Sequence, residues 1–264
     1  FAHIAAMKMF PGAIYISYPN FEEAYNSVVN GECDTCVLPL ENSFAGDVGL
    51  VMDLMFSGPL YVNQVIELEV VQNLLAKKGT KIEDIKKVVS HQQALSQCRD
   101  YITKKAFKEE EMANTAVAAK YVSASCDNTI AAIASSDTAN IYGLEILDSN
   151  INSSHNNTTR FGAFSRSLNE QANQTKMGNH FILVFTVKNE AGALAKTLNI
   201  IGSHGFNMRS LRSRPMKELI WNYYFYVELE GNINSSDGKD MLKALGIFCD
   251  KLKLVGTYVY KIEK

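Results

Sequence analysis

The chain has 264 residues, of which 47% are apolar and 20% are charged, a composition typical of a folded protein long enough for two hydrophobic cores. Its net charge is −2 and it contains no block of lysine and arginine, which excludes nucleic acid and membrane surfaces as expected partners. No apolar run reaches the roughly 18 residues that a membrane-spanning helix needs. Small molecules are therefore the expected partners.

The chain begins with Phe1 instead of methionine, and residues 1–10 have the apolar spacing of a helix. In an α/β fold a strand should precede this helix, so we expect further residues upstream of Phe1.

Residues 1–167 alternate between short β-branched runs and helical stretches, which is the rhythm of a mostly parallel α/β sheet. The expected strands are 13–17, 34–40, 87–90, 129–134 and 159–165. The expected helices are 1–10, 21–30, 47–56, 92–104, 115–123 and 137–142, the second of them capped by Asn20. The run 59–75 has no helical period and is expected to be a strand that leads from one half of this domain to the other.

Three polar loops follow strands or open helices in this part of the chain. They are Glu41-Asn42-Ser43, Ser90-His91-Gln92-Gln93 and Asn114-Thr115. Ligands of open α/β sheets bind beyond the carboxyl ends of the strands, so these residues are candidates for binding. Asparagine and serine also cap helices for purely structural reasons, and one such loop alone decides little.

The segment from Asn156 to Phe164 leads amide and hydroxyl side chains straight into an apolar strand. The guanidinium of Arg160 beside Thr159 offers a bidentate grip on a carboxylate and a neutral donor for a departing oxygen. The alternative is a turn followed by a strand whose Arg160 faces solvent. Together with the three loops, the segment favours a site rich in neutral donors and suited to an anion.

The cysteines favour a reducing compartment, because five scattered residues do not form a disulfide framework. Cys33 and Cys36 form a Cys-x-x-Cys pair, but no second pair or histidine cluster completes a zinc site. We expect no metal and no cofactor, since neither a ligand cluster nor a nucleotide-binding loop is present.

A polar stretch at 168–177 has no apolar period and is typical of a linker. Beyond it, the pattern predicts strands at 180–188, 207–214, 222–230 and 251–260 and helices at 192–204 and 235–249. The order is βαββαβ, the ferredoxin-like arrangement.

Three separated motifs together resemble the prephenate dehydratase family. They are Glu41-Asn42-Ser43, Ser90-His91-x-Gln93-Ala94-Leu95-x-Gln97-Cys98 and Asn157-x-Thr159-Arg160-Phe161. Gly192-Ala193-Leu194 and Ser213-Arg214-Pro215 resemble an ACT domain, the amino-acid-sensing module that follows such enzymes. The resemblance implies a bilobal, periplasmic-binding-protein-like catalytic domain at 1–167, a linker at 168–177 and a ferredoxin-like ACT regulatory domain at 178–264.

The chain departs from the family pattern at three places. Gln92 stands where the family usually has proline, and Arg212 stands where it usually has glutamate before Ser-Arg-Pro, which changes the charge of the effector site. The family's first strand and its glycine-rich turn do not appear. Upstream residues are expected to supply that strand or, as in some fused relatives, a whole chorismate mutase domain.

The resemblance implies a cytoplasmic homodimer or tetramer that converts prephenate to phenylpyruvate, carbon dioxide and water, with L-phenylalanine as feedback inhibitor. Thr159 is implied as the donor to the leaving hydroxyl and Arg160 as the anchor of a carboxylate. A threonine hydroxyl is too weakly acidic to protonate a leaving group unaided, so we treat Thr159 as a donor in a relay.

The other implied site residues fall into two sets. The implied substrate-binding residues are Asn42, Ser43, Ser90, His91, Gln93, Thr115, Asn157 and Phe161. The implied effector-binding residues are Gly192, Ala193, Leu194, Ser213 and Arg214. His91 is either a proton donor or only the cap of the following helix. A dehydratase acting on arogenate and a non-catalytic, two-lobed solute-binding protein are the alternative functions.

Overall fold

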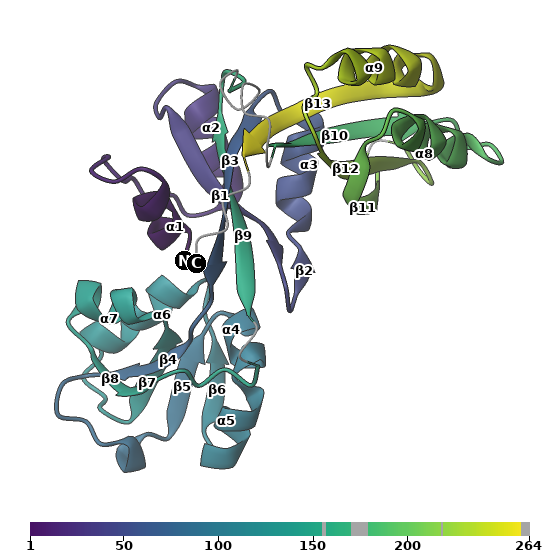
Figure 1. Ribbon diagram of the computed structural model, residues 1–264. Helices are drawn as coiled ribbons and strands as arrows, with labels where there is room; N and C mark the ends of the chain where they lie inside the picture. Colours follow the sequence, from purple (N-terminus) through teal and green to yellow (C-terminus); the bar gives the residue numbers. More distant parts are fainter. Residues whose placement is uncertain (155–156, 170–178, 218, 260–264) are drawn as a thin grey trace. The chain divides into compact units, whose positions relative to one another are not determined.

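A computed structural model of the protein describes residues 1–154, 157–169, 179–217 and 219–259 (Figure 1). The chain divides into two compact units. The first unit contains Phe1, Asn42–Gly46 and Leu68–Thr159, and the second contains Ala2–Glu41, Asp47–Glu67 and the chain from Arg160 onward.

The first unit is built on a five-stranded sheet of order β6-β5-β7-β4-β8. Its strands are β4 (Asn73–Ala76), β5 (Lys87–Ser90), β6 (Lys108–Glu111), β7 (Ile130–Ala134) and β8 (Glu145–Asp148). Because β5 is parallel to β6 and β7 while β4 is antiparallel to β7 and β8, the sheet is mixed. A short 3-10 helix at Ile82–Asp84 precedes β5.

Helices cover both faces of this sheet. They are α4 (Gln92–Gln97), α5 (Arg99–Lys105), α6 (Thr115–Ala124) and α7 (Ser136–Tyr142). Within β7, Ala131 and Ile133 share a core with α4 and α5, whereas Ala132 and Ala134 share a core with α6 and α7. The central strand is therefore apolar at every position, as expected for a strand buried on both faces.

The second unit contains an eight-stranded sheet of order β11-β12-β10-β13-β3-β9-β1-β2. Its strands are β1 (Thr35–Asn42), β2 (Gly46–Asp47), β3 (Tyr61–Glu69), β9 (Thr158–Ser165), β10 (Asn179–Val187), β11 (Asn207–Pro215), β12 (Tyr223–Glu230) and β13 (Cys249–Val259). Its helices are α1 (Ala2–Met9), α2 (Phe21–Val29), α3 (Gly49–Ser57), α8 (Ala193–Ser203) and α9 (Ser236–Phe248).

The βαββαβ prediction for the carboxyl-terminal part is confirmed, with β10, α8, β11, β12, α9 and β13 in that order. These four strands do not form a separate sheet, because β13 pairs in parallel with β3 at Gly256 and Val62. A side chain at Gly256 would place its Cβ 2.0 Å from the carbonyl oxygen of Val62, so the close approach requires glycine.

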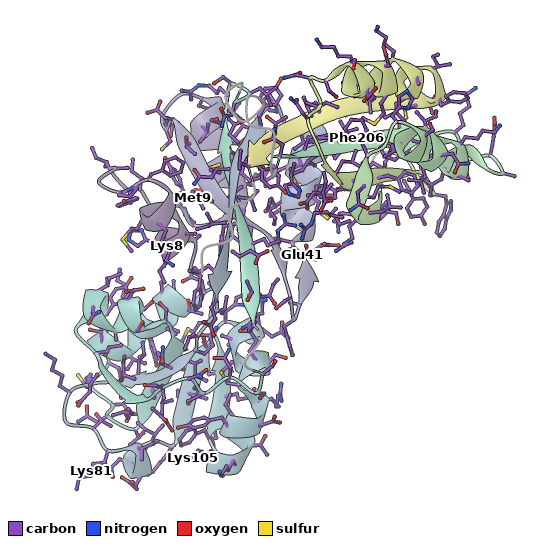
Figure 2. The ribbon with its side chains drawn as sticks, in the orientation of Figure 1. Lys8, Met9, Glu41, Lys81, Lys105 and Phe206 are labelled. Carbon is purple, nitrogen blue, oxygen red and sulfur yellow. The ribbon has the colours of Figure 1, made fainter. Side chains whose placement is uncertain are left out.

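Strand β10 separates the two cores of the second unit. Phe181, Leu183 and Phe185 pack in the core with α8 and α9, which Phe206, labelled in Figure 2, also joins. Ile182 and Val184 pack on the opposite face, in the core that contains α2 and α3. Alternate residues of one strand thus pack against α8 and α9 on one side and against α2 and α3 on the other.

Most expected elements of the first 167 residues are confirmed within one or two residues, and Asn20 caps α2 by accepting from the Glu23 amide at 2.8 Å. The expected strand at 13–17 is wrong. No described strand pairs with it, and Ile14 and Ile16 are 92% and 59% exposed. The β-branched pattern of residues 13–17 does not produce a strand here, because an extended segment needs a partner strand for its backbone hydrogen bonds.

Other expectations need correction. The helix expected at 47–56 begins at Gly49, because Gly46–Asp47 pair as β2. The helix expected at 92–104 breaks at Cys98 into α4 and α5, and the strand expected in 59–75 is two strands, β3 and β4. Strand β6 was not expected, since Lys-Glu-Glu-Glu is exposed throughout and has no apolar alternation. In the expected linker, residues 170–177 lie outside the described residues, and the predicted domain limits stay predictions.

Candidate active site

Asn42, at the end of β1, is the centre of a buried hydrogen-bond network in the first unit. Its Oδ1 accepts from the amides of Phe44 and Ala45 at 3.0 and 2.8 Å. These two N–H donors fix the orientation of the side-chain amide. Its Nδ2 then donates to Asn157 Oδ1 at 2.8 Å and to Thr159 Oγ1 at 2.8 Å.

The network determines what the Thr159 hydroxyl can do. Thr159 is buried, and its oxygen accepts a hydrogen bond from Asn42. A hydroxyl that accepts from an amide keeps its own hydrogen for another acceptor. The arrangement therefore leaves the Thr159 hydrogen for another acceptor, and donation to a leaving oxygen stays a prediction.

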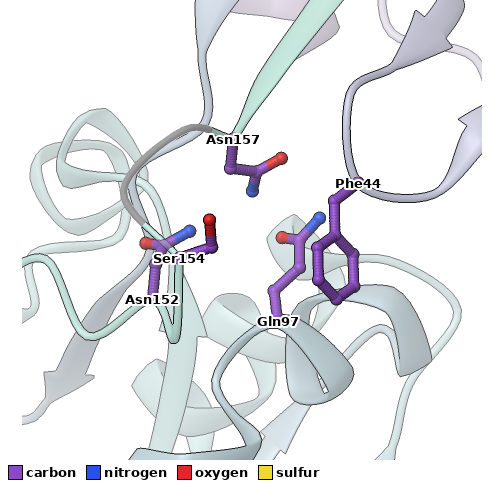
Figure 3. A pocket seen from close by; sticks show the side chains of 5 residues that line it. All are labelled: Phe44, Gln97, Asn152, Ser154 and Asn157. Carbon is purple, nitrogen blue, oxygen red and sulfur yellow. The ribbon is translucent and has the colours of Figure 1, made fainter.

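Phe44 and four polar residues, in or beside this network, line a small hollow in the first unit (Figure 3). Its lining residues are Phe44, Gln97, Asn152, Ser154 and Asn157. Gln97 Oε1 accepts from the side-chain Nε2 of Gln72 at 3.1 Å, and Asn152 Oδ1 accepts from the backbone amide of Gln72 at 2.7 Å. The predicted site omitted Gln97 and Asn152. Gln97 had a signal, since it closes the second motif, but Asn152 lies in a loop without any pattern.

Four predicted residues lie on the carboxyl side of β5 and β6. Ser90 is fully buried and its hydroxyl donates to the Ile133 carbonyl at 2.6 Å, while His91 caps α4 by accepting from the Gln93 amide at 3.2 Å. Gln93 is exposed and Thr115 opens α6. Because β5 and β6 are parallel neighbours, the loops after them meet at one edge of the sheet.

In the described part of the chain, no hydrogen bond joins these four side chains to the Asn42 network. Ser43 does join the turn, since its hydroxyl accepts from the Thr158 amide at 2.9 Å. The structure thus brings together Asn42, Ser43, Asn157 and Thr159 from two distant segments. The cap role of His91 is confirmed, and a proton role for it stays a prediction.

Arg160, in the second unit, is bound by a protein carboxylate. Its Nη1 and Nη2 donate to the two oxygens of Glu228 at 2.7 and 2.8 Å, and Nη2 also donates to the Tyr258 hydroxyl at 2.9 Å. Glu41 and Glu67 lie at 3.8 and 3.9 Å. The alternative of a solvent-facing arginine is wrong, because the Arg160 side chain is only 16% exposed. Contact with a substrate carboxylate stays a prediction.

Strand geometry separates the residues of the third motif. Successive side chains of a strand point to opposite faces, so Thr159 and Phe161 share one face of β9 and Arg160 lies on the other. Phe164, on the Arg160 side, packs in the core with α2 and α3. The hydroxyl and the guanidinium were expected side by side, but they project in opposite directions.

Comparison with models of known protein families finds two matches in the chain. The prephenate dehydratase family model matches residues 1–169, and the ACT domain model matches residues 181–246. The chain belongs to the prephenate dehydratase family.

Relatives from this family align with nearly the whole chain. A bifunctional chorismate mutase/prephenate dehydratase of Neisseria gonorrhoeae is 33% identical over 98% of this chain and 71% of its own length. A prephenate dehydratase of Arthrobacter aurescens, solved in complex with L-Phe, has a TM-score of 0.87 and 26% identity over 97% of this chain and 86% of that one.

A third related structure carries a different description. It is described as GqqA, a novel type of quorum quenching acylase, and has a TM-score of 0.88 and 27% identity over 98% of this chain and 94% of that one. Plant arogenate dehydratases are also among the relatives. The predicted family, fold class and enzyme class are confirmed.

In the ACT domain, the predicted effector residues lie at two places. Gly192 caps α8 with a φ of +79°, which favours glycine, and Ala193 and Leu194 form the first residues of that helix. On β11, Ser213 is paired with Phe225 and Arg214 with Tyr224. Paired residues share a face, so Ser213 lies on the face of α8 and Arg214 on the opposite face.

Two arginines of β11, Arg212 and Arg214, bind acidic residues of β1, β2 and α3. Arg214 Nε and Nη2 donate to the Asp53 carboxylate at 3.0 and 3.2 Å, and the Tyr224 hydroxyl donates to it at 2.8 Å. Desolvation opposes ionisation of Asp53, but these hydrogen bonds outweigh it and lower its pKa. Arg212 pairs with Glu41 at 2.8 Å and with Asp47 at 3.0 Å. The charge change at position 212 is therefore compensated within the second unit.

No cluster of three or more histidine, cysteine or acidic residues fit to hold a metal occurs among the residues that the structure describes. No helix in the described ranges is both long and apolar enough to cross a membrane.

Proposed function

We propose that the chain converts prephenate to phenylpyruvate, with Thr159 as the hydrogen-bond donor to the leaving oxygen, and that L-phenylalanine inhibits it through the ACT domain. The observation that supports the catalytic part most directly is the bond from Asn42 to the Thr159 oxygen, which leaves the threonine hydrogen for substrate.

The chemistry asks little of the protein beyond position and polarity. When the carboxylate of the ring leaves as carbon dioxide, its bonding electrons complete the aromatic ring, and the ring hydroxyl departs with both electrons of its bond. The departing hydroxide takes up a proton and becomes water. Donors that meet the developing negative charge lower the barrier, and no external oxidant or reductant is needed.

The binding shell of this proposal consists mainly of neutral donors. It comprises Asn42, Ser43, Ser90, His91, Gln93, Thr115, Asn157 and Phe161. Arg160, which the sequence predicted as the anchor of a carboxylate, is already bound to Glu228 and is not part of the proposed shell. Asn42, Asn157 and Thr159 are buried and hydrogen-bonded to each other. A rigid amide network can hold the hydroxyl in one orientation, which is what a single oriented donor requires.

Arogenate is the alternative substrate, and it differs from prephenate only in carrying an amino group in place of the keto group. Relatives of both kinds match the chain, and no described residue distinguishes the side chains of the two substrates. A non-catalytic solute-binding protein of similar lobed fold is the second alternative. The Asn42 network, which prepares a donor, is not needed by a simple binder.

An acylase activity has less support from the site. Acyl transfer by a hydroxyl uses an adjacent base, usually an imidazole. Here the Ser90 hydroxyl donates to a backbone carbonyl, and the Thr159 oxygen accepts from an amide. Neither hydroxyl has the bond to a base that an activated nucleophile requires.

The test is turnover of the purified full-length protein on both acids. Prephenate is incubated with the protein and phenylpyruvate is followed by its ultraviolet absorbance, while arogenate is followed by the phenylalanine it releases. We expect turnover of prephenate. Binding of prephenate without product would establish the solute-binding alternative, and turnover of arogenate alone would change the substrate.

The regulatory part rests on the ACT match and on the related structure in complex with L-Phe. We place the effector on the α8 face at Gly192, Ala193, Leu194 and Ser213, in a dimer or tetramer of a cytoplasmic protein whose ACT domain spans 178–264. Arg214, on the opposite face and bound to Asp53, stays a prediction from the sequence. An effector that binds one packing of two such domains better than another shifts the protein toward that packing. Isothermal titration of the intact oligomer with L-phenylalanine tests this, and a titration without heat would remove the claim.

A further inference from the structure

Arg160 is bound from two strands of the ACT part of the sheet. Glu228 comes from β12 and Tyr258 from β13, and both contact the guanidinium directly. In the chain, Arg160 is bonded to Thr159. The ACT sheet therefore reaches the residue next to the proposed donor without any intervening side chain.

The contact is built as a complete buried cluster. Glu228 is 0% exposed and Tyr258 is 0% exposed, and the Tyr258 hydroxyl also donates to Glu228. The His180 ring stacks on Tyr258 with centroids 5.4 Å apart, and its Nδ1 lies 3.7 Å from Glu228. A bidentate guanidinium–carboxylate pair inside a core has one geometry, so it fixes β9 relative to β12 and β13.

Two properties of the pair argue against Arg160 acting mainly as a free grip for substrate. Both terminal nitrogens already donate to Glu228, and two further carboxylates, Glu41 and Glu67, lie within 4 Å of the guanidinium. A substrate carboxylate could reach only the N–H groups that do not face Glu228 and Tyr258. Glu41 and Glu67 lie near those groups, and their negative charges would repel it.

We propose that Glu228 is a positioning residue for the dehydration reaction. It holds Arg160, and through the backbone of β9 it holds Thr159 in line with Asn42, so that the ACT sheet forms part of the support of the reacting hydroxyl. The proposal rests on the proposed function, because it assigns Glu228 a role in that same reaction.

The test measures kcat and KM for prephenate in Glu228→Gln, which keeps the shape of the side chain and removes its charge. A misplacement of about 1 Å can cost roughly 100-fold in rate, so we expect kcat to fall by about 10- to 100-fold with little change in KM. Glu230→Gln is the matched control. Glu230 lies on the same strand, and its oxygens bind Arg209 and Asn207 at the surface, so it should behave as the wild type.

Two further variants guard against a simple folding defect. Tyr258→Phe removes one hydroxyl and keeps the ring stacked on His180, and we expect a smaller fall in kcat in the same direction. The double variant Arg160→Gln with Glu228→Gln should lose no more than the worse single variant, because residues that act as a unit are not additive.

The outcomes separate this inference from the proposed function. A wild-type protein without turnover on prephenate overturns both. An active wild type together with an unchanged kcat in Glu228→Gln overturns the positioning role alone. A raised KM at unchanged kcat also overturns it, because such a change would mean that the pair affects substrate binding and not the placement of Thr159.

Discussion

At the scale of single residues, Asn42 determines the geometry of the site. Both ends of its amide are used, one by the turn at Phe44 and Ala45 and the other by Asn157 and Thr159. Alanine at this position would remove the hydrogen-bond partner of the buried Asn157 and Thr159 side chains and of the partly buried Phe44 and Ala45 amides. Buried groups that lose their partners are costly, and each retains its desolvation penalty.

We therefore expect Asn42→Ala to lower the free energy of unfolding by about 2 kcal/mol and to lower prephenate turnover as well. Urea unfolding and the turnover assay measure the two effects. Asn20→Ala is the control, because Asn20 only caps α2 at the surface, and it should cost about 1 kcal/mol without changing turnover. Equal stability of the two variants, with full turnover in Asn42→Ala, would contradict the assigned network.

Some residues of the site could be predicted from the sequence and others could not. Asn42, Asn157 and Thr159 were predicted together from separate motifs, and the structure joins them by hydrogen bonds. The partner of Arg160 was not predicted. Glu228 follows it by 68 residues in a strand whose pattern resembles any buried strand, and no local signal marks such a long-range pair.

At the scale of elements, the junction of β13 with β3 carries the connection between the two parts of the second unit. The two strands pair at Gly256 and Val62. A Cβ at position 256 would overlap the Val62 carbonyl oxygen. The sequence predicted both strands, but periodicity describes one strand at a time and contains no information on which edges pair. The continuous sheet could therefore not be predicted from the pattern.

We expect Gly256→Ala to lower the free energy of unfolding by about 2 kcal/mol or more, because the added methyl overlaps a backbone oxygen that cannot rotate away. Differential scanning calorimetry provides the measurement. In contrast, Gly246→Ala in α9 meets no atom within 4 Å and should raise stability by about 0.5 to 1 kcal/mol. The prediction fails if the two alanine variants change the melting temperature in the same direction.

The Asp53–Arg214 and Glu228–Arg160 ion pairs predict that the stability of the fold depends on pH. Burial opposes ionisation of Asp53 and of Glu228, but hydrogen bonds from Arg214 and from Arg160 outweigh it, so both pKa values lie below their usual 3.8 and 4.5. Groups with lowered pKa values stabilise the fold above their unfolded pKa and lose this contribution as the pH falls through the folded value.

We therefore expect the contribution of these two groups to the free energy of unfolding to be constant above about pH 5 and to fall steeply below about pH 4. Urea unfolding at a series of pH values measures it. Asp53→Asn removes one of the two groups and should show a shallower fall. An identical acid profile in this variant would show that the Asp53–Arg214 pair does not contribute.

At the scale of the whole molecule, the proposed dehydration site lies in one unit and the ACT sheet is part of the other. The family could be inferred from three motifs and is confirmed by matches over most of the chain. Sequence patterns could not predict that the third motif divides, with Thr159 hydrogen-bonded to Asn42 and Arg160 hydrogen-bonded to Glu228. That division follows from the alternation of a strand whose exact register only the structure shows.

In the proposed reaction the Thr159 hydroxyl is the oriented donor to the leaving oxygen. The most direct measurement is kcat for prephenate in Thr159→Val, which keeps the shape of the side chain, beside Thr159→Ser, which keeps the hydroxyl. We expect the valine variant to lose about 100-fold or more, as when an oxyanion donor is removed, and the serine variant to retain most of the turnover. Turnover at the wild-type rate in Thr159→Val would rule out this role for the Thr159 hydroxyl.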